Sequence, residues 1–157
     1  MKPNILSAAL LSLSLLGFGA RAHSATCAVA TSAVAFGAYD PQSNKPRDTN
    51  SAVQVTCSGS PGEKVGYVLA LVSPDGEREL DNMSKSPGTL QFNLYLDIAR
   101  TQVWGDGTNG TAVIRDSVVL TSSTNRRDYT IYGRISGGQR RATAGHYQKN
   151  FLTSLTY

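Results

Sequence analysis

The chain has 157 residues, 17% of them charged and 40% hydrophobic, with a formal net charge of +4. This length suits one globular domain with a sizeable core rather than two domains. The positive charge is too small to indicate a nucleic-acid-binding protein, and part of it lies in the first residues.

The first residues have the features of a secretory signal peptide. Lys2 supplies the positive start, Ile5 to Gly19 form an apolar stretch, and Ala20-Arg21-Ala22 matches an A-x-A cleavage site. We therefore expect residues 1–22 to be a signal peptide and residues 23–157 to form the exported domain.

Cleavage after Ala25 is less favourable, because His23 would then stand where signal peptidase needs a small side chain. The apolar stretch of the signal is too short to span a bilayer, and no later segment is long and apolar enough. The sequence predicts an exported protein without a membrane span.

The two cysteines, Cys27 and Cys57, both lie in the exported part. An even number of cysteines in an oxidising compartment is most simply one disulfide, and a metal site would need more ligands. Closing a loop of about 31 residues stabilises a fold by roughly 3–4 kcal/mol.

Apolar residues alternate with polar ones along most of the exported part, which is typical of β-strands. The clearest case is Leu90–Asp97, where Leu90, Phe92, Leu94 and Leu96 share one face. Other strands are expected at Val65–Val72, Val113–Leu120, Tyr129–Ile135 and Tyr147–Tyr157, with polar, turn-rich segments at Asp40–Ser51 and Ser136–Gly145. Short strands at this spacing predict an all-β antiparallel sandwich.

The cysteines fit this pattern. Cys57 shares a face with Val53 and Val55, and Cys27 is in phase with Val29. The disulfide is therefore expected to join the first two strands from inside the sandwich. After Thr31 the apolar phase shifts to Val34 and Phe36, so the first strand should kink or change partner there.

The last predicted strand is apolar on one side up to the final residue of the sequence. Its alternating face is formed by Phe151, Thr153, Leu155 and Tyr157. Such a strand is either a finished edge of the sandwich or an edge that awaits a strand from another chain.

Two loop features have competing interpretations. Trp104 either packs beneath the tight turn Trp104-Gly105-Asp106-Gly107 or contacts a sugar, and packing is favoured. Asp106, Thr108 and Asn109 predict a polar turn rather than a calcium site, so no metal or cofactor is expected.

Basic residues gather in the last third of the sequence, where they are either scattered solvated charges, the favoured interpretation, or a site for anionic polysaccharide or lipid. They are Arg126, Arg127, Arg134, Arg140, Arg141, His146 and Lys149.

Catalytic signals are weak. His146 is the one imidazole well inside the domain, and Ser58-Gly59-Ser60-Pro61-Gly62 lacks the first glycine of a nucleophile elbow. Glu77 and Glu79 are expected to lie in a polar loop. The sequence predicts that the protein is not an enzyme.

A series of short motifs, in this order and spacing, resembles the spore coat protein U domain family, which includes pilin subunits of archaic chaperone/usher pili of the Csu type. The motifs are Cys27, Phe36-Gly37-Ala38-Tyr39-Asp40, Val55-Thr56-Cys57, Leu90-Gln91-Phe92-Asn93-Leu94-Tyr95, Trp104-Gly105-Asp106-Gly107, Ile131-Tyr132-Gly133-Arg134, Gly145-His146-Tyr147 and Leu155-Thr156-Tyr157.

The resemblance implies an incomplete immunoglobulin-like β-sandwich that lacks its last strand. It implies as partners a periplasmic chaperone, an outer-membrane usher and a neighbouring pilin subunit, which donates the missing strand. The acceptor edge would be lined by Phe151, Thr153, Leu155 and Tyr157. The protein would pass through the periplasm to the cell surface, as part of a fimbria or coat that supports adhesion or biofilm formation.

A subunit that donates a strand needs about 10 residues before its own first strand. Cleavage after Ala22 leaves His23 to Thr26 before Cys27, so we expect this subunit to accept a strand and not to donate one. It would then be a tip subunit or a coat component. The alternative function is a self-contained secreted module that binds carbohydrate or another surface through loop residues such as Trp104 or Arg140.

Overall fold

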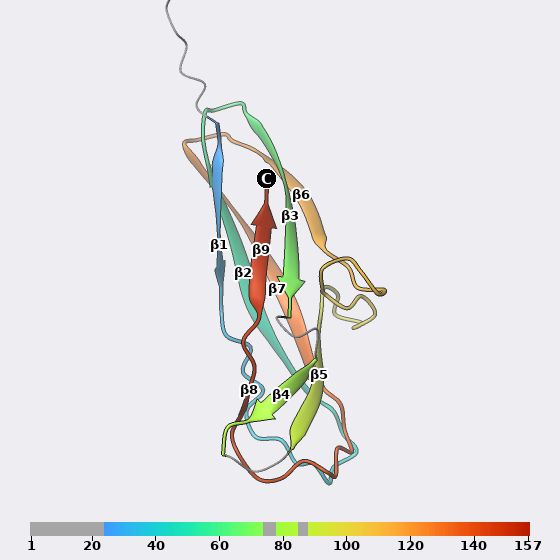
Figure 1. The fold of residues 1–157 in the computed structure, drawn as a ribbon. Helices are drawn as coiled ribbons and strands as arrows, with labels where there is room; N and C mark the ends of the chain where they lie inside the picture. The colour runs from blue at the N-terminus through green and yellow to red at the C-terminus, as the bar shows by residue number, and fades with distance from the viewer. Residues whose placement is uncertain (1–23, 74–77, 85–87) are drawn as a thin grey trace, which may run out of the picture.

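The computed structural model describes residues 24–73, 78–84 and 88–157, so the predicted signal peptide and His23 lie outside the described residues. The described part is built from strands (Figure 1). They are β1 (Thr26–Thr31), β2 (Arg47–Ser58), β3 (Lys64–Val72), β4 (Glu79–Asn82), β5 (Thr89–Tyr95), β6 (Ile114–Val119), β7 (Thr124–Ile135), β8 (Tyr147–Gln148) and β9 (Leu152–Thr156). No helix in these ranges is long and apolar enough to cross a membrane.

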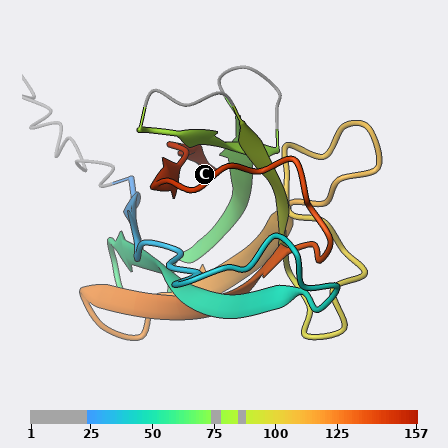
Figure 2. The same ribbon diagram turned by 90° about the horizontal axis from the view of Figure 1, so that it is seen from below.

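The strands form two antiparallel sheets. The larger sheet has the order β1-β2-β7-β5-β4-β8, and the smaller sheet has the order β6-β3-β9. The larger sheet curls around the smaller one, as the view along the strands shows (Figure 2). The predicted all-β antiparallel sandwich is confirmed.

The core lies between the sheets and follows the alternation in the sequence. Leu90, Phe92 and Leu94 of β5 are each at most 4% exposed. In β2 the buried residues Val53, Val55 and Cys57 alternate with half-buried neighbours. Since successive strand residues point to opposite faces, one side of each strand closes the core and the other faces solvent.

The predicted last strand Tyr147–Tyr157 is wrong as a single element. β8 pairs with β4 in the larger sheet, and β9 pairs with β3 in the smaller sheet. The chain crosses from one sheet to the other at residues 149–151, which interrupts the ladder. Periodicity alone does not separate the two strands, because Tyr147 and Phe151 keep the same phase on either side of the polar residues 148–150.

Two further segments differ from the prediction. Asp40–Ser51 was expected to be a turn-rich connection, but β2 begins at Arg47 and pairs with β7 from there onward. The predicted polar loop is wrong at Glu79, which begins β4 and lies opposite Gln91 of β5, whereas Glu77 lies outside the described residues. Both segments are polar because one side of the larger sheet faces solvent, which weakens the strand signal.

Candidate functional site: the open edge between β1 and β9

A groove of about 1120 Å³ runs along one edge of the sandwich. One wall is formed by residues 31–41, after β1, and the other by residues 142–153, which lead into β9. Its floor consists of core side chains of both sheets, among them Val53, Leu71, Phe92, Leu94, Trp104 and Ile131. The hydrophobic core of the sandwich is therefore reached directly from this edge.

β9 has a strand partner on one side only. Leu155 pairs with Leu69 of β3 and Thr153 with Leu71, so the side chains of Leu155 and Thr153 point inward like their buried partners. On the other side of β9, toward β1, no strand pairs with it within the described residues (Figure 1). The N–H and C=O groups on that side are available to another strand.

The structure brings together most of the predicted acceptor residues. Phe151 and Thr153 line the groove, and Leu155 packs against the core beside it. The Phe151 ring meets Phe92 edge-on, with 5.5 Å between the ring centroids. Tyr157 lies apart from the other three, because it is 56% exposed and borders a separate shallow hollow at the end of β9.

The opposite wall is held in place by side chains of β2. After the backbone bond from Ser32 N to Ala52 O, the chain leaves the β2 ladder. Arg47 Nε then donates to the Phe36 carbonyl at 2.7 Å, and Thr49 Oγ1 donates to the Ala35 carbonyl at 2.8 Å. The predicted change of phase after Thr31 corresponds to this departure. The wall is ordered without being a strand.

Phe36 closes this wall onto the core. Its ring contacts Phe92 edge-on with centroids 6.0 Å apart. Gly133 of β7 makes room for it, since a Cβ there would lie 2.9 Å from the Phe36 ring. Phe36, Phe92 and Phe151 thus form a row of aromatic rings from one wall of the groove to the other.

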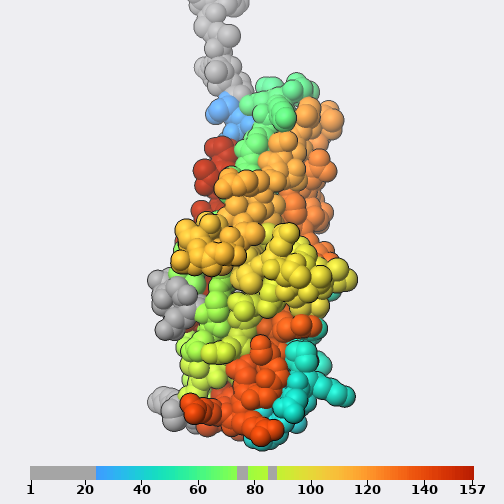
Figure 3. Space-filling view, turned by 90° about the vertical axis from the view of Figure 1, so that its right-hand side faces the viewer, coloured from blue at the N-terminus to red at the C-terminus, as the bar shows by residue number. Residues whose placement is uncertain are grey.

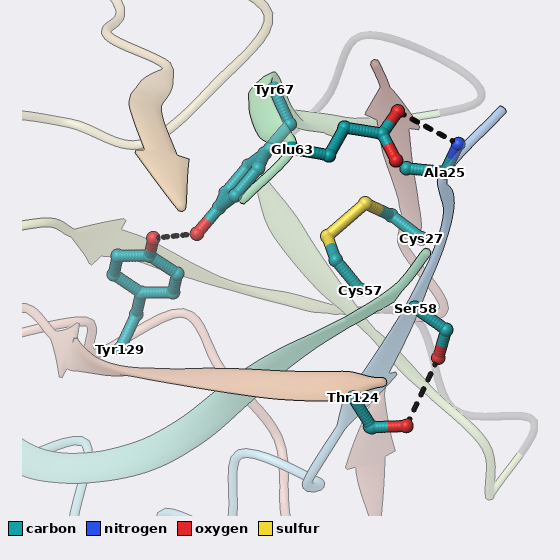
Figure 4. The surroundings of a disulfide bond; sticks show 8 residues. All are labelled: Ala25, Cys27, Cys57, Ser58, Glu63, Tyr67, Thr124 and Tyr129. Carbon is teal, nitrogen blue, oxygen red and sulfur yellow. Dashed lines mark hydrogen bonds between the residues drawn. A yellow bond between two sulfur atoms is a disulfide. The ribbon is translucent and has the colours of Figure 1, made fainter. Parts of the chain in front are cut away.

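The disulfide between Cys27 and Cys57 is confirmed, and it fixes β1 beside β2 (Figure 4). The two residues are directly paired across the strands. Just before β1, the backbone N–H of Ala25 donates to Glu63 Oε1 at 3.2 Å. Ala25 also packs against the core, so the described chain is already part of the sandwich at that residue.

A tyrosine pair links the two sheets away from the groove. The hydroxyl groups of Tyr67 in β3 and Tyr129 in β7 are hydrogen-bonded (Figure 4). Tyr129 also donates to Asp116 Oδ2 in β6 at 2.7 Å. This bond is the main reason that the pKa of Asp116 lies below its ordinary value, whereas burial is the main cause of the raised pKa of Tyr129.

Trp104 is 2% exposed and its indole N–H donates to the Leu69 carbonyl at 3.4 Å, so it packs in the core and the interpretation as a sugar contact is wrong. The turn after it is held by Asp106, whose carboxylate accepts hydrogen bonds from Thr108 and Thr111. Gly107 has a φ of 87°, which favours glycine. Within the described residues no group of three His, Cys, Asp or Glu could hold a metal ion.

The basic residues of the last third do not form one site. Arg126 forms an ion pair with Asp128, and Lys149 forms one with Asp81. Arg134 donates two hydrogen bonds to the two carboxylate oxygens of Asp48. Arg140, Arg141 and His146 are exposed in the segment between β7 and β8, which carries none of these three ion pairs.

Sequence reasoning missed one side of the groove and one residue beside it. The wall 32–41 could not be placed from periodicity, because an alanine separates Val34 from Phe36 and the stretch has no regular alternation of apolar and polar residues. The residue beside the groove is Arg78. Its Nη2 donates to the Trp104 carbonyl at 2.8 Å, and its Cζ lies 5.6 Å from the centroid of the Phe151 ring. Burial lowers the pKa of Arg78.

A family model of the Spore Coat Protein U domain matches residues 17–153. No curated protein matches the chain by sequence. The matched range covers both walls and the floor of the groove, although it ends within β9. The family is one of structural pilin-type domains, associated with chaperone–usher pili and coats. By this match the chain belongs to the Spore Coat Protein U domain family.

Proposed function

We propose that this protein is a structural subunit of a chaperone–usher surface fibre or coat, completed by a β-strand that another protein inserts beside β9. A periplasmic chaperone would supply that strand first, and a neighbouring subunit would replace it after delivery to the usher. The assembled fibre or coat would support adhesion or biofilm formation.

The open core carries this proposal. Interiors of complete domains are close-packed and contain few voids larger than a water molecule. Here a groove of about 1120 Å³ is floored by side chains of the main core. An added strand would pair with the free side of β9 and place alternate apolar side chains on that floor, which is the β-augmentation mode of recognition.

The two strands nearest this opening, β1 and β9, also lack the charged residues that protect strand edges. β9 has the sequence LTSLT and β1 the sequence TCAVAT, without a charged residue in either. Exposed edges in monomeric proteins are usually blunted by lysine, proline, bulges or inward-pointing charges. β9 and the last residue of β1, Thr31, both reach the groove, which supports insertion of a strand at this edge.

The predicted cleavage after Ala22 bears on the position in the fibre. Ala25 already contacts the core and Glu63, so almost no chain would remain to be donated. We propose that the mature subunit accepts a strand without donating one, which places it at a fibre end or in a coat. Mass spectrometry of the mature N-terminus tests this, and a start ten or more residues before Cys27 would contradict it.

The acceptor role is testable without knowing the natural donor. A short Gly/Ser linker and a strand of alternating valine and threonine are added after Tyr157, where a hairpin would return the strand beside β9. Valine side chains on the groove floor should raise Tm by more than about 5 °C. The matched control carries serine in place of valine.

The unextended protein gives the second measurement. We expect it to aggregate or to be cleaved readily by protease when it is purified alone, because its core is open. Equal Tm values for the valine and serine strands, or a stable protease-resistant monomer without any added strand, would contradict the proposal.

A further inference from the structure

Two turns lie together at the end of the molecule that is opposite the start of β1 and the C-terminus (Figure 1). In the first, Ser43 N donates to the Asp40 carbonyl at 3.1 Å. In the second, Ala142 N donates to the Gln139 carbonyl at 2.9 Å, so Arg140 and Arg141 occupy the two central positions of a β-turn. The space-filling view shows the two segments side by side at this end (Figure 3).

The two loops are interlocked through their backbones. Gly138 N donates to the Ser43 carbonyl at 2.7 Å. A Cβ on Gly137 would lie 2.2 Å from the Asn44 carbonyl oxygen and 3.0 Å from the carbonyl carbon of Lys45, so only glycine fits. This close approach holds Lys45 against the loop that carries the two arginines.

The base of the arginine turn is anchored to the sandwich. Gln139 Oε1 accepts the N–H of Gln91 at 2.7 Å, and Gln139 Nε2 donates to the carbonyl of the same residue at 2.7 Å. On the other side of the turn, Ala142 packs against the core. The turn is therefore ordered before any ligand binds, which lowers the entropy lost on binding.

The charge of these turns is positive. Lys45, Arg140 and Arg141 are exposed, and none of them forms an ion pair within the part of the chain that the structure describes. The one acidic residue of segments 40–46 and 136–145 is Asp40, whose carboxylate accepts the Gln42 N–H at 2.9 Å. Within these two segments, three cations thus stand with one carboxylate.

We propose that this end of the molecule binds an acidic polysaccharide through Lys45, Arg140 and Arg141. A guanidinium binds a carboxylate through two parallel hydrogen bonds, and two successive arginines on a turn can reach two carboxylates. These side chains stand on an exposed turn rather than in an enclosed pocket, so a single small anion would be weakly held. A polymer with a carboxylate on each sugar engages several cations at once. This site is separate from the groove and does not depend on strand insertion.

The probe is polygalacturonate, with neutral dextran as the comparison, and the readout is the dissociation constant at low and at moderate salt. The full exported chain should bind polygalacturonate and not dextran, and salt should weaken binding. Arg140→Gln with Arg141→Gln should weaken it about tenfold. Arg115→Gln with Arg127→Gln removes the same charge from exposed arginines of β6 and β7 and should leave binding unchanged.

Two more variants separate geometry from charge. Arg140→Lys with Arg141→Lys keeps the charge but removes the bidentate hydrogen bonds to carboxylates. We therefore expect a measurable loss of affinity that is smaller than the loss in the glutamine variant. Gly137→Ala changes no charge and should weaken binding by forcing the loops apart, provided that circular dichroism shows a folded protein. If it does not fold, the arginine variants still decide the question.

Several outcomes would overturn the inference. They are equal binding to dextran, an equal loss in the Arg115 and Arg127 control, or full affinity after both arginines of the turn are replaced. Binding to phosphatidylglycerol vesicles without binding to polygalacturonate would also overturn it, since the ligand would then be a lipid surface.

Discussion

The two outer strands of the three-stranded sheet, β6 and β9, differ in how their free sides are protected. β6 carries Arg115 and Asp116 in six residues, whereas β9 carries no charge in five. Charged residues on an edge strand discourage pairing with another chain, because pairing would bury them. One edge of the same sheet is therefore protected and the other is left open.

The two edges also differ in what lies between the sheets beside them. At β6, the Asp116 carboxylate accepts a hydrogen bond from Tyr129 of the larger sheet, which in turn is bonded to Tyr67. This chain of polar groups ties the two sheets together. At β9, the space toward the other sheet is the groove. The interior is thus closed by polar contacts along β6 and open to the groove along β9.

The largest expected effect comes from placing a charge on the open edge. In the protein extended by the valine strand, Thr153→Lys should abolish the gain in Tm, because the inserted strand would bury an unpaired ammonium group at a cost of about 3–5 kcal/mol. Thr153 lines the groove and points inward. Thermal unfolding followed by circular dichroism measures the effect.

The control on the other edge strand of the same sheet is Ser117→Lys of β6, whose side chain shares the outward face of its partner Gly66. It should leave the gain in Tm intact, since no strand is expected to pair there. If both lysines abolish the gain, or neither does, the two edges are equivalent and the comparison fails.

The second prediction concerns the disulfide that holds β1, the strand that leads into the wall of residues 31–41. Replacing both cysteines, Cys27→Ala with Cys57→Ala, should lower the free energy of unfolding by roughly 3–4 kcal/mol, because the disulfide closes a 30-residue separation between β1 and β2. Urea unfolding of the oxidised protein and of the variant measures the difference. Export yield and protease resistance should fall with it, and unchanged unfolding would show that the disulfide is not needed to hold β1.

Much of the open edge can be predicted from the sequence, because it depends on local alternation. Thr153 and Leu155 share the inner face of a strand, and the cysteines share the inner face of theirs, as periodicity indicates. The sequence also indicates a change of phase after Thr31, although it predicts a kink or a new partner there and the strand instead ends. These properties involve residues two or four positions apart.

The groove wall and the joined basic turns depend on contacts between residues far apart in the sequence. Arg47 and Thr49 hold the wall at Phe36 and Ala35 through side-chain bonds, and no local pattern encodes them. The approach of Gly137 to Asn44 that joins the two basic turns is equally non-local. At the crossing at residues 149–151, Tyr147 and Phe151 keep the same phase on either side of three polar residues, so the phase does not indicate the change of sheet.

The third prediction removes the charge from the protected edge. Asp116→Val should make β6 prone to self-association at neutral pH, since the edge loses its inward-pointing carboxylate. The Tyr129 hydroxyl also loses an acceptor, so the free energy of unfolding should fall by about 1–2 kcal/mol. Analytical ultracentrifugation measures association, and Ser154→Val on β9 is the comparison for an edge without such a carboxylate. A monomeric Asp116→Val protein would show that another feature protects β6.

The smallest expected effect is a pH dependence of the stability that the Asp116 carboxylate contributes to the folded state. The Tyr129 hydroxyl holds the pKa of Asp116 below its ordinary value of 3.8, so the ionised carboxylate stabilises the folded state. This contribution is fully present above the pKa of the unfolded chain and is lost as the pH falls through the lower pKa of the folded state. The difference in urea midpoint between the unsubstituted protein and Asp116→Asn should therefore be constant near neutral pH and shrink below about pH 4.

Other carboxylates titrate in both proteins and largely cancel in this difference. A difference that does not change with pH would mean that the protection of β6 comes from the shape of the Asp116 side chain and its hydrogen bond, and not from its charge.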